Sequence, residues 1–140
     1  MNLHADQGFV PNSTPYPIIV NALYSLCDFT GDNGATRIAP GTHDSREHGP
    51  YYTHPPDSVP VVVPAGTMLI FDGRIWHGTG ANTTDEPRYA LLATYCRPWV
   101  RQFENFGLSL DDATLAVCSP TLRKLLGFKV FATKNGIDIF

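Results

Sequence analysis

A histidine and an aspartate stand two residues apart near the start of the sequence, as His4 and Asp6. In an extended strand, residues i and i+2 point to the same face, so an imidazole and a carboxylate would converge on one point. Two such ligands and a third from elsewhere make the facial triad that binds Fe(II) and leaves coordination positions open. Alone the pair is a weak signal, because a polar, frayed N-terminus explains it more simply.

Two further residues strengthen the case for a site. His77 ends an apolar strand-and-turn segment, residues 71–77, and Gly78 and Gly80 follow it, where missing side chains allow close backbone approach. Arg88 opens the next expected strand, and its planar guanidinium can hold a carboxylate through two bonds. Considered singly, such a histidine is a packed core residue and such an arginine a solvated charge. Together with the His-x-Asp pair, they could form a metal site beside a carboxylate fork.

Short β-rich segments must position these residues. Proline and glycine cut the first hundred residues into pieces, and the apolar, β-branched or aromatic pieces bounded by turn residues predict strands. These pieces are residues 18–26, 61–63, 67–71 and 89–95. Several such strands without a long amphipathic helix between them favour an antiparallel sandwich or jelly roll. Residues 41–60 hold three histidines and few apolar side chains, which predicts a surface excursion between strands.

Helix signals appear only late in the chain. Ser109 is expected to cap a short helix with Asp111 in its first turn, where a carboxylate suits the helix dipole. Ser119 followed by proline predicts the start of a second helix, which Gly127 would end. Residues 135–136, Asn-Gly, are typical of a hairpin turn.

Length, charge and cysteine usage limit the class of protein. The 140 residues suit one domain, and the net charge of −3 disfavours a nucleic-acid binder, which needs a basic face. No apolar run approaches the roughly 18–20 residues of a membrane span, and the N-terminus lacks the pattern of a signal peptide, so we expect a cytoplasmic protein without a membrane partner. Cys27, Cys96 and Cys118 are odd in number and widely spaced, which predicts buried thiols.

The ordered motifs resemble the phytanoyl-CoA dioxygenase family of Fe(II)- and 2-oxoglutarate-dependent oxygenases. The resemblance runs from Leu3 to about Gly127, and several ordered segments at family-like spacing are more specific than any one of them. The segments that carry it are residues 3–9, 28–37, 40–43, 64–67, 71–82, 88, 97–102, 105 and 125–127.

The resemblance implies a mainly β fold. A double-stranded β-helix (jelly roll) core would occupy residues 1–104, incomplete at its N-terminus. Short helices and a tail, residues 105–140, would belong to the same domain. Family members carry additional residues mostly before the His-x-Asp pair. We therefore expect a loosely held ligand at His4, because chain termini fray, with weak or absent turnover in isolation. A sheet edge left uncovered would favour a homodimer.

The resemblance also implies a site and an activity. His4, Asp6 and His77 would bind iron, with no catalytic residue beyond these ligands. Arg88 would pair with the distal carboxylate of 2-oxoglutarate, with the Thr79 hydroxyl beside it. The protein would be a dioxygenase that hydroxylates a small organic molecule with O₂ while decarboxylating 2-oxoglutarate to succinate.

Five further residues have expected positions outside the metal cluster. Asn21 and Tyr24, on the strand after the metal pair, are expected to line the cosubstrate pocket. His43 is expected to be structural, in a turn that leaves a strand, and the histidines at 48 and 54 are expected to be exposed.

Two alternative functions remain open at this point. One is a catalytically silent, truncated jelly-roll domain that acts as a binding or structural module. The other is a cupin-like metalloenzyme that uses iron without 2-oxoglutarate. Arg88 disfavours the second, since nothing else near His77 requires a carboxylate fork.

Overall fold

The computed structural model describes residues 3–8, 14–44 and 57–128. Contacts divide the chain into two compact units, Met1–Tyr95 and Cys96–Phe140. The expected boundary at residue 104 within one domain stays a prediction. The expectations for the histidines at 48 and 54 and for a turn at 135–136 concern parts of the chain outside the described residues.

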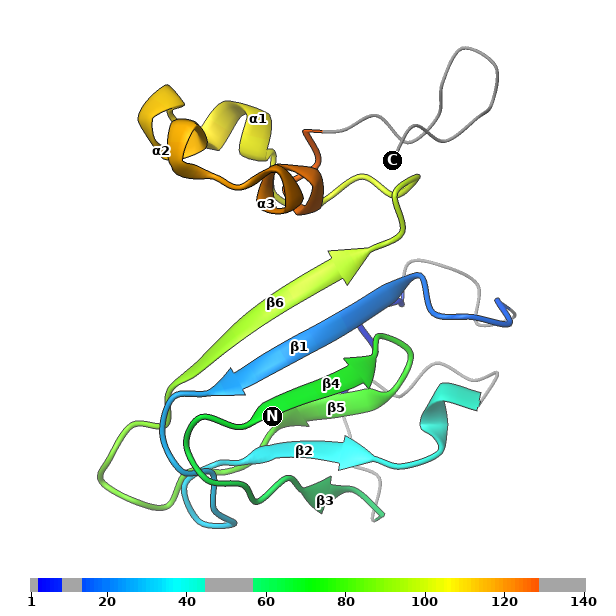
Figure 1. Ribbon diagram of the computed structural model, residues 1–140. Coiled ribbons are helices and arrows are strands. Elements are labelled where there is room, and N and C mark those ends of the chain that lie inside the picture. The colour runs from blue at the N-terminus through cyan, green and yellow to red at the C-terminus, as the bar shows by residue number, and fades with distance from the viewer. Residues whose placement is uncertain (1–2, 9–13, 45–56, 129–140) are drawn as a thin grey trace. The chain divides into compact units, whose positions relative to one another are not determined.

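The first unit contains two three-stranded sheets (Figure 1). In one, β1 (Ile19–Ser25) lies between β4 (Met68–Asp72) and β6 (Ala90–Cys96). β1 and β4 are antiparallel, with Val20 opposite Asp72. These three strands confirm the predictions made from the apolar segments at 18–26, 67–71 and 89–95. The mainly β class is confirmed, while a closed jelly roll stays a prediction.

The other sheet is built from short strands. β2 (Thr36–Ala39) lies between β3 (Val59–Pro60) and β5 (Trp76–Thr79) and is antiparallel to both. The 3₁₀ turn η1 (Thr42–Asp44) follows β2, and the hydroxyl of Thr42 accepts the backbone N–H of Trp76 at 2.9 Å. This bond fixes the start of β5, the strand that carries His77.

The expected strand at residues 61–63 is wrong. The strand found there is the two-residue β3, and Val63 makes only an isolated bridge with Phe29. The backbone N–H of Val61 donates to Thr36, whereas that of Val63 donates to Phe29. The segment therefore passes from one partner to another instead of following a single strand.

The core of the first unit lies under β1 and β4. Leu23, Phe29, Ala35 and Phe71 form one buried cluster. Burying such side chains contributes about 1.5–3 kcal/mol for each large apolar group. Leu23 and Phe71 also line the cavity described below, so the core and the candidate site share a wall.

The N-terminal segment pairs with the edge of β5 through its backbone. Leu3 is fully buried, and His4 exchanges two backbone hydrogen bonds with His77, each 2.9 Å long. This pairing adds residue 4 to the free edge of β5. The expectation that His4 is loosely held is therefore wrong for this structure, because its two backbone hydrogen bonds to β5 hold it in place.

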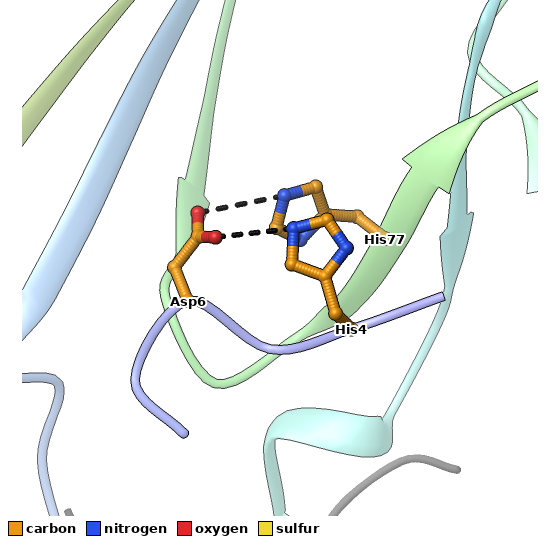
Figure 2. Close-up of side chains that lie close together, drawn as sticks. All are labelled: His4, Asp6 and His77. Carbon is orange, nitrogen blue, oxygen red and sulfur yellow. Dashed lines mark ion pairs between the residues drawn. The ribbon is translucent and has the colours of Figure 1, made fainter. Parts of the chain in front are cut away.

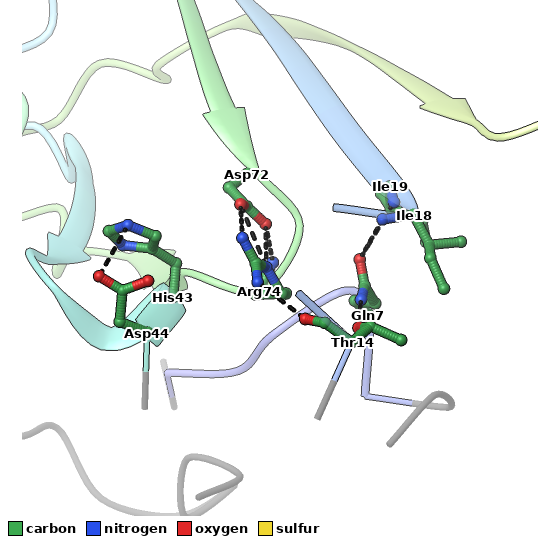
Figure 3. A network of polar contacts seen from close by, with 8 residues as sticks. All are labelled: Gln7, Thr14, Ile18, Ile19, His43, Asp44, Asp72 and Arg74. Carbon is green, nitrogen blue, oxygen red and sulfur yellow. Dashed lines mark hydrogen bonds and ion pairs between the residues drawn. The ribbon is translucent and has the colours of Figure 1, made fainter. Parts of the chain in front are cut away.

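Gln7 ties the same segment to the start of β1 (Figure 3). Its side chain is buried, and Oε1 accepts the backbone N–H groups of Ile18 at 2.7 Å and Ile19 at 3.2 Å. Its Nε2 donates to the Thr14 hydroxyl at 3.0 Å, and its backbone N–H donates to Gly73. The buried amide of Gln7 thus satisfies two backbone N–H groups at the start of β1.

An ion pair fastens the turn between β4 and β5. Nη2 of Arg74 lies 2.6 Å from Oδ2 of Asp72, and Nη1 donates to the Thr14 carbonyl at 3.1 Å (Figure 3). Burial alone would raise the pKa of Asp72, but the hydrogen bonds and charge of Arg74 outweigh it and hold this pKa below its usual value. His43 makes only a partly exposed pair with Asp44, in keeping with a structural role.

The second unit holds three short helices, α1 (Phe106–Ser109), α2 (Asp112–Val117) and α3 (Pro120–Leu125). The prediction that Ser109 caps a helix is wrong: Ser109 ends α1, and Asp111 caps α2 by accepting the Thr114 N–H. A carboxylate serves this position as well as a hydroxyl does. Ser119 caps α3 as predicted, and Gly127 follows the end of α3 with a φ of +85°.

The structure also describes the three cysteines. The cysteines are free, but all three are partly exposed, so their predicted burial is wrong. Each thiol lies within 3.7 Å of a backbone carbonyl: Cys27 of Tyr89, Cys96 of Val100 and Cys118 of Thr114. Among the described residues, no helix is long and apolar enough to cross a membrane.

Candidate metal centre

Three side chains meet where the N-terminal segment pairs with β5 (Figure 2). Nε2 of His4 lies 3.3 Å from Oδ1 of Asp6, and Nε2 of His77 lies 3.5 Å from Oδ2 of Asp6. One donor atom from each residue lies within 4.8 Å of the others. Metal bonds of about 2.0–2.2 Å at right angles would place neighbouring donor atoms about 3 Å apart. The cluster is therefore close to the size that a single ion requires.

The backbone brings Asp6 to the cluster by a turn. His4 is paired in an extended bridge, but the chain turns at Asp6, so strand alternation does not aim the two side chains. The two backbone bonds between His4 and His77 set their rings 4.5 Å apart. The predicted convergence is observed, and the expected strand geometry behind it is wrong.

His77 is prepared to act as a neutral ligand. Its Nδ1 lies 3.1 Å from the Ile75 carbonyl, an acceptor, so Nδ1 carries the proton and Nε2 keeps its lone pair. Burial lowers the pKa of His77, which outweighs the opposing influence of the Ile75 carbonyl and of Asp6. The edge of the Phe71 ring lies against the imidazole, with ring centroids 4.7 Å apart. His77 is thus uncharged at neutral pH and its free nitrogen faces Asp6.

A cavity of about 190 Å³ adjoins the cluster. Its polar wall comes from Thr36, Thr79 and Arg88 together with the three clustered side chains. Its apolar wall is formed by Leu23, Phe71, Ala90 and Leu92. His77 and Thr79 are two residues apart on β5, and Thr79 lies opposite Thr36 on β2. The short second sheet thus supplies both a cluster residue and the hydroxyls beside it.

Arg88 is held in place by contacts with Gly34 and Phe29. Its Nε donates to the Gly34 carbonyl at 2.8 Å, and its guanidinium carbon lies 4.4 Å from the centre of the Phe29 ring. Gly34 has a φ of +82°, a conformation that other residues rarely adopt, and an added Cβ would lie 3.1 Å from the Gly80 carbonyl. Since the bond to Gly34 uses only Nε, the two Nη groups are left to meet a ligand.

The role of Asn21 and Tyr24 at a cosubstrate pocket stays a prediction. Asn21 is completely buried and its amide donates to Asp6. Because side chains alternate along a strand, Tyr24 lies on the face of β1 opposite Leu23, which lines the cavity. Neither Asn21 nor Tyr24 is among the lining residues.

Sequence reasoning missed Thr36 as a cavity residue. It is buried on β2, within the segment 28–37 that carries the family resemblance. No local pattern marks Thr36, because its place in the cavity comes from the pairing of β2 with β5, in which it lies opposite Thr79.

Two histidines and a carboxylate are the residue types that mononuclear non-haem iron proteins use as ligands. Here they lie beside an arginine-bearing cavity on a mainly β scaffold. Comparison with protein families gives the particular group. The family model described as phytanoyl-CoA dioxygenase (PhyH) matches residues 1–90, and the chain belongs to this family.

Two relatives are named dioxygenases, and a solved structure shares the fold. The chain is 36% identical over 132 residues to dioxygenase af480 of Aspergillus fumigatus, covering 90% of this chain and 42% of the relative. It is 30% identical over 143 residues to dioxygenase andF of Emericella variicolor, covering 99% and 50%. The crystal structure of EvdO2 from Micromonospora carbonacea var. aurantiaca shares the fold, with a TM-score of 0.54 and 20% identity over 66% of this chain and 43% of that one. The chain spans about half the length of the curated relatives it matches.

Proposed function

We propose that the chain carries the site of an Fe(II)- and 2-oxoglutarate-dependent dioxygenase that hydroxylates a small organic molecule and yields succinate. The observation that supports this most is the cluster of His4, Asp6 and His77, with donor atoms within 4.8 Å, beside a cavity that contains Arg88. The dioxygenases among the chain's relatives and its place in the phytanoyl-CoA dioxygenase family favour the same activity.

The donor set fits iron. Imidazole and carboxylate ligands suit Fe(II), and a set of three leaves positions for a cosubstrate and O₂. The proton on Nδ1 of His77 is held by the Ile75 carbonyl, which leaves Nε2 as the ligand atom. Bound iron would supply the activation of O₂, the chemistry that side chains cannot perform.

The remaining roles belong to the protein. Arg88 would hold the distal carboxylate of 2-oxoglutarate through its Nη groups, because Nε is already committed to Gly34. The Thr79 hydroxyl, which lines the same cavity, would donate to that carboxylate. Leu23 and Phe71, which line the same cavity, would exclude water from it, which strengthens the polar contacts inside.

Succinate formation tests this proposal. The purified chain is incubated with Fe(II), 2-oxoglutarate and O₂, and succinate is measured with and without each component. Weak turnover is expected from a loosely held His4, but His4 is held by two backbone bonds to His77. We therefore expect succinate that requires all three components and that His77→Ala abolishes. His43→Ala is the matched control, because His43 lies outside the cluster and should retain activity.

The same assay separates the alternative function. If the wild-type chain binds Fe(II) but forms no succinate under any condition, the chain is a silent binding module and the proposal is refuted. Arg88→Lys refines the test, since it keeps the charge but loses the planar fork. Loss of charged hydrogen bonds worth about 1.5–3 kcal/mol should raise the KM for 2-oxoglutarate roughly 10- to 150-fold.

A further inference from the structure

A fully buried amide contacts the carboxylate of the metal cluster. Asn21 lies on β1 with no exposed surface, and its Nδ2 donates to Oδ2 of Asp6 at 2.6 Å. The Thr94 hydroxyl on β6 donates to Oδ1 of Asn21 at 2.9 Å. We propose that Asn21, oriented by Thr94, is a positioning residue that sets which oxygen of Asp6 binds the metal. This inference rests on the metal site of the proposed function.

Both neighbours of Asn21 select the same amide orientation. An ionised carboxylate only accepts hydrogen bonds, so the NH₂ group of Asn21 must face Asp6. The carboxamide oxygen is then directed to Thr94, whose hydroxyl can donate. A flipped amide would place two acceptors 2.6 Å apart at Asp6. The Thr94 hydroxyl therefore stabilises the orientation that Asp6 requires.

The hydrogen bond from Asn21 makes the two carboxylate oxygens of Asp6 different from each other. Oδ2 accepts the bond from Asn21 and lies 3.5 Å from Nε2 of His77, whereas Oδ1 lies 3.3 Å from Nε2 of His4 and accepts no bond from Asn21. The terminal torsion of an aspartate is broad and roughly two-fold, so an unrestrained carboxylate would exchange its oxygens. With Asn21 in place, Asp6 would bind a metal through Oδ1 alone.

This chain of contacts also links the two sheets. His4 and His77 are paired at the edge of the second sheet, whereas Asn21 and Thr94 belong to adjacent strands of the first. Asp6 is hydrogen-bonded to the first sheet through Asn21, and its carboxylate faces His77 on the second sheet. Asn21 is therefore the contact through which β1 and β6 fix the distance between the carboxylate and the two imidazoles.

Cobalt binding provides the test. Co(II) takes the same ligands as Fe(II), is stable in air and has a visible absorption spectrum that reports ligand geometry. Loss of a partner that orients a metal ligand typically weakens affinity 10- to 100-fold. We expect Asn21→Ala to weaken Co(II) binding by about that factor and to change the visible spectrum. Thr94→Val should have a smaller effect in the same direction, and Thr94→Ser, which keeps the hydroxyl, should match the wild type.

Controls separate positioning from folding. Thr94 is exposed on its strand and valine favours strands, so Thr94→Val should fold even if Asn21→Ala does not. Urea unfolding of the metal-free variants measures any loss of stability independently of Co(II). If Asn21→Ala folds and Thr94→Val folds, and both bind Co(II) with wild-type affinity and spectrum, the inference is overturned. It is also overturned if Thr94→Ser loses as much affinity as Thr94→Val.

The outcomes also distinguish this inference from the proposed function. A wild-type chain that binds no Co(II) refutes the metal site, and the inference fails with it. A wild type that binds Co(II) and variants that do so equally well refute the inference alone. Weaker binding by the variants, with no succinate from the wild type, supports the inference and refutes the oxygenase activity.

Discussion

Replacing Gln7 by methionine should destabilise the protein strongly for a defined reason. Methionine resembles glutamine in length and volume, so the substitution leaves little empty space. It removes the carbonyl oxygen that accepts the backbone N–H groups of Ile18 at 2.7 Å and Ile19 at 3.2 Å. Both bonds are buried, and water cannot replace them.

The magnitude follows from those two donors. A buried donor left without a partner costs about 1–3 kcal/mol, so the pair should cost about 2–6 kcal/mol. Typical domains are stable by only about 5–15 kcal/mol, so this loss is large. Because residue 7 directly follows Asp6, the same change should loosen the segment that carries two of the three cluster residues and weaken metal binding.

Urea unfolding followed by tryptophan fluorescence and far-UV circular dichroism measures this loss. Gln102→Met is the matched control, because Gln102 makes a single exposed bond to the Leu125 carbonyl. The control should lose less than about 1 kcal/mol. A Gln7→Met variant whose free energy of unfolding lies within about 1 kcal/mol of the wild type would refute the reasoning.

Three further predictions concern packing, pH and assembly. Gly73→Ala should cost about 1–3 kcal/mol in a thermal melt, because its Cβ would lie 2.7 Å from Cβ of Ile19, whereas Gly31→Ala, with open space around it, should be neutral. The pKa of Asp72 lies below its ordinary 3.8 because of Arg74, so its contribution to stability is present above that pH and is lost as the pH falls through the lowered value. The difference in unfolding free energy between wild type and Asp72→Asn should therefore be constant near neutrality and shrink below pH 3.8; a difference independent of pH would contradict this. Among the described strands β6 pairs only with β1, so sedimentation velocity should detect a dimer that uses its outer edge, and a monomer at all concentrations would contradict it.

The strands that the sequence predicts correctly are those with a continuous apolar run. β1, β4 and β6 combine β-branched and aromatic residues between turn residues, so local preference and packing agree. β2 could not be predicted in the same way. Its four residues, TRIA, hold two apolar side chains, and β2 becomes a strand only because β3 and β5 pair with it.

The candidate site, like the strands, could be predicted only in part from the sequence. His4, Asp6 and His77 could be proposed from the sequence because short motifs carry them. The way the structure holds His4 could not, since its backbone bonds join residues 73 positions apart. Terminal position predicts fraying only where no strand offers an edge, and β5 offers one here.

Asn21 shows most clearly which contacts the sequence does not predict. Its sequence position, within an apolar run after the metal pair, suggested a pocket residue. Its contacts join residues 6, 21 and 94, and no local pattern encodes such a set. A buried polar residue inside an apolar strand does indicate a specific partner, because an unpaired amide there would be costly. The partner itself comes only from the fold.

We propose that His4, Asp6 and His77 hold one iron ion beside a cavity in which Arg88 receives 2-oxoglutarate. Anaerobic titration of the chain with Fe(II) in the presence of 2-oxoglutarate tests it most directly, followed by the visible charge-transfer band. We expect a band that saturates at one iron per chain and is absent from His77→Ala. A wild-type chain that develops no band, or a band that His77→Ala retains, would contradict it.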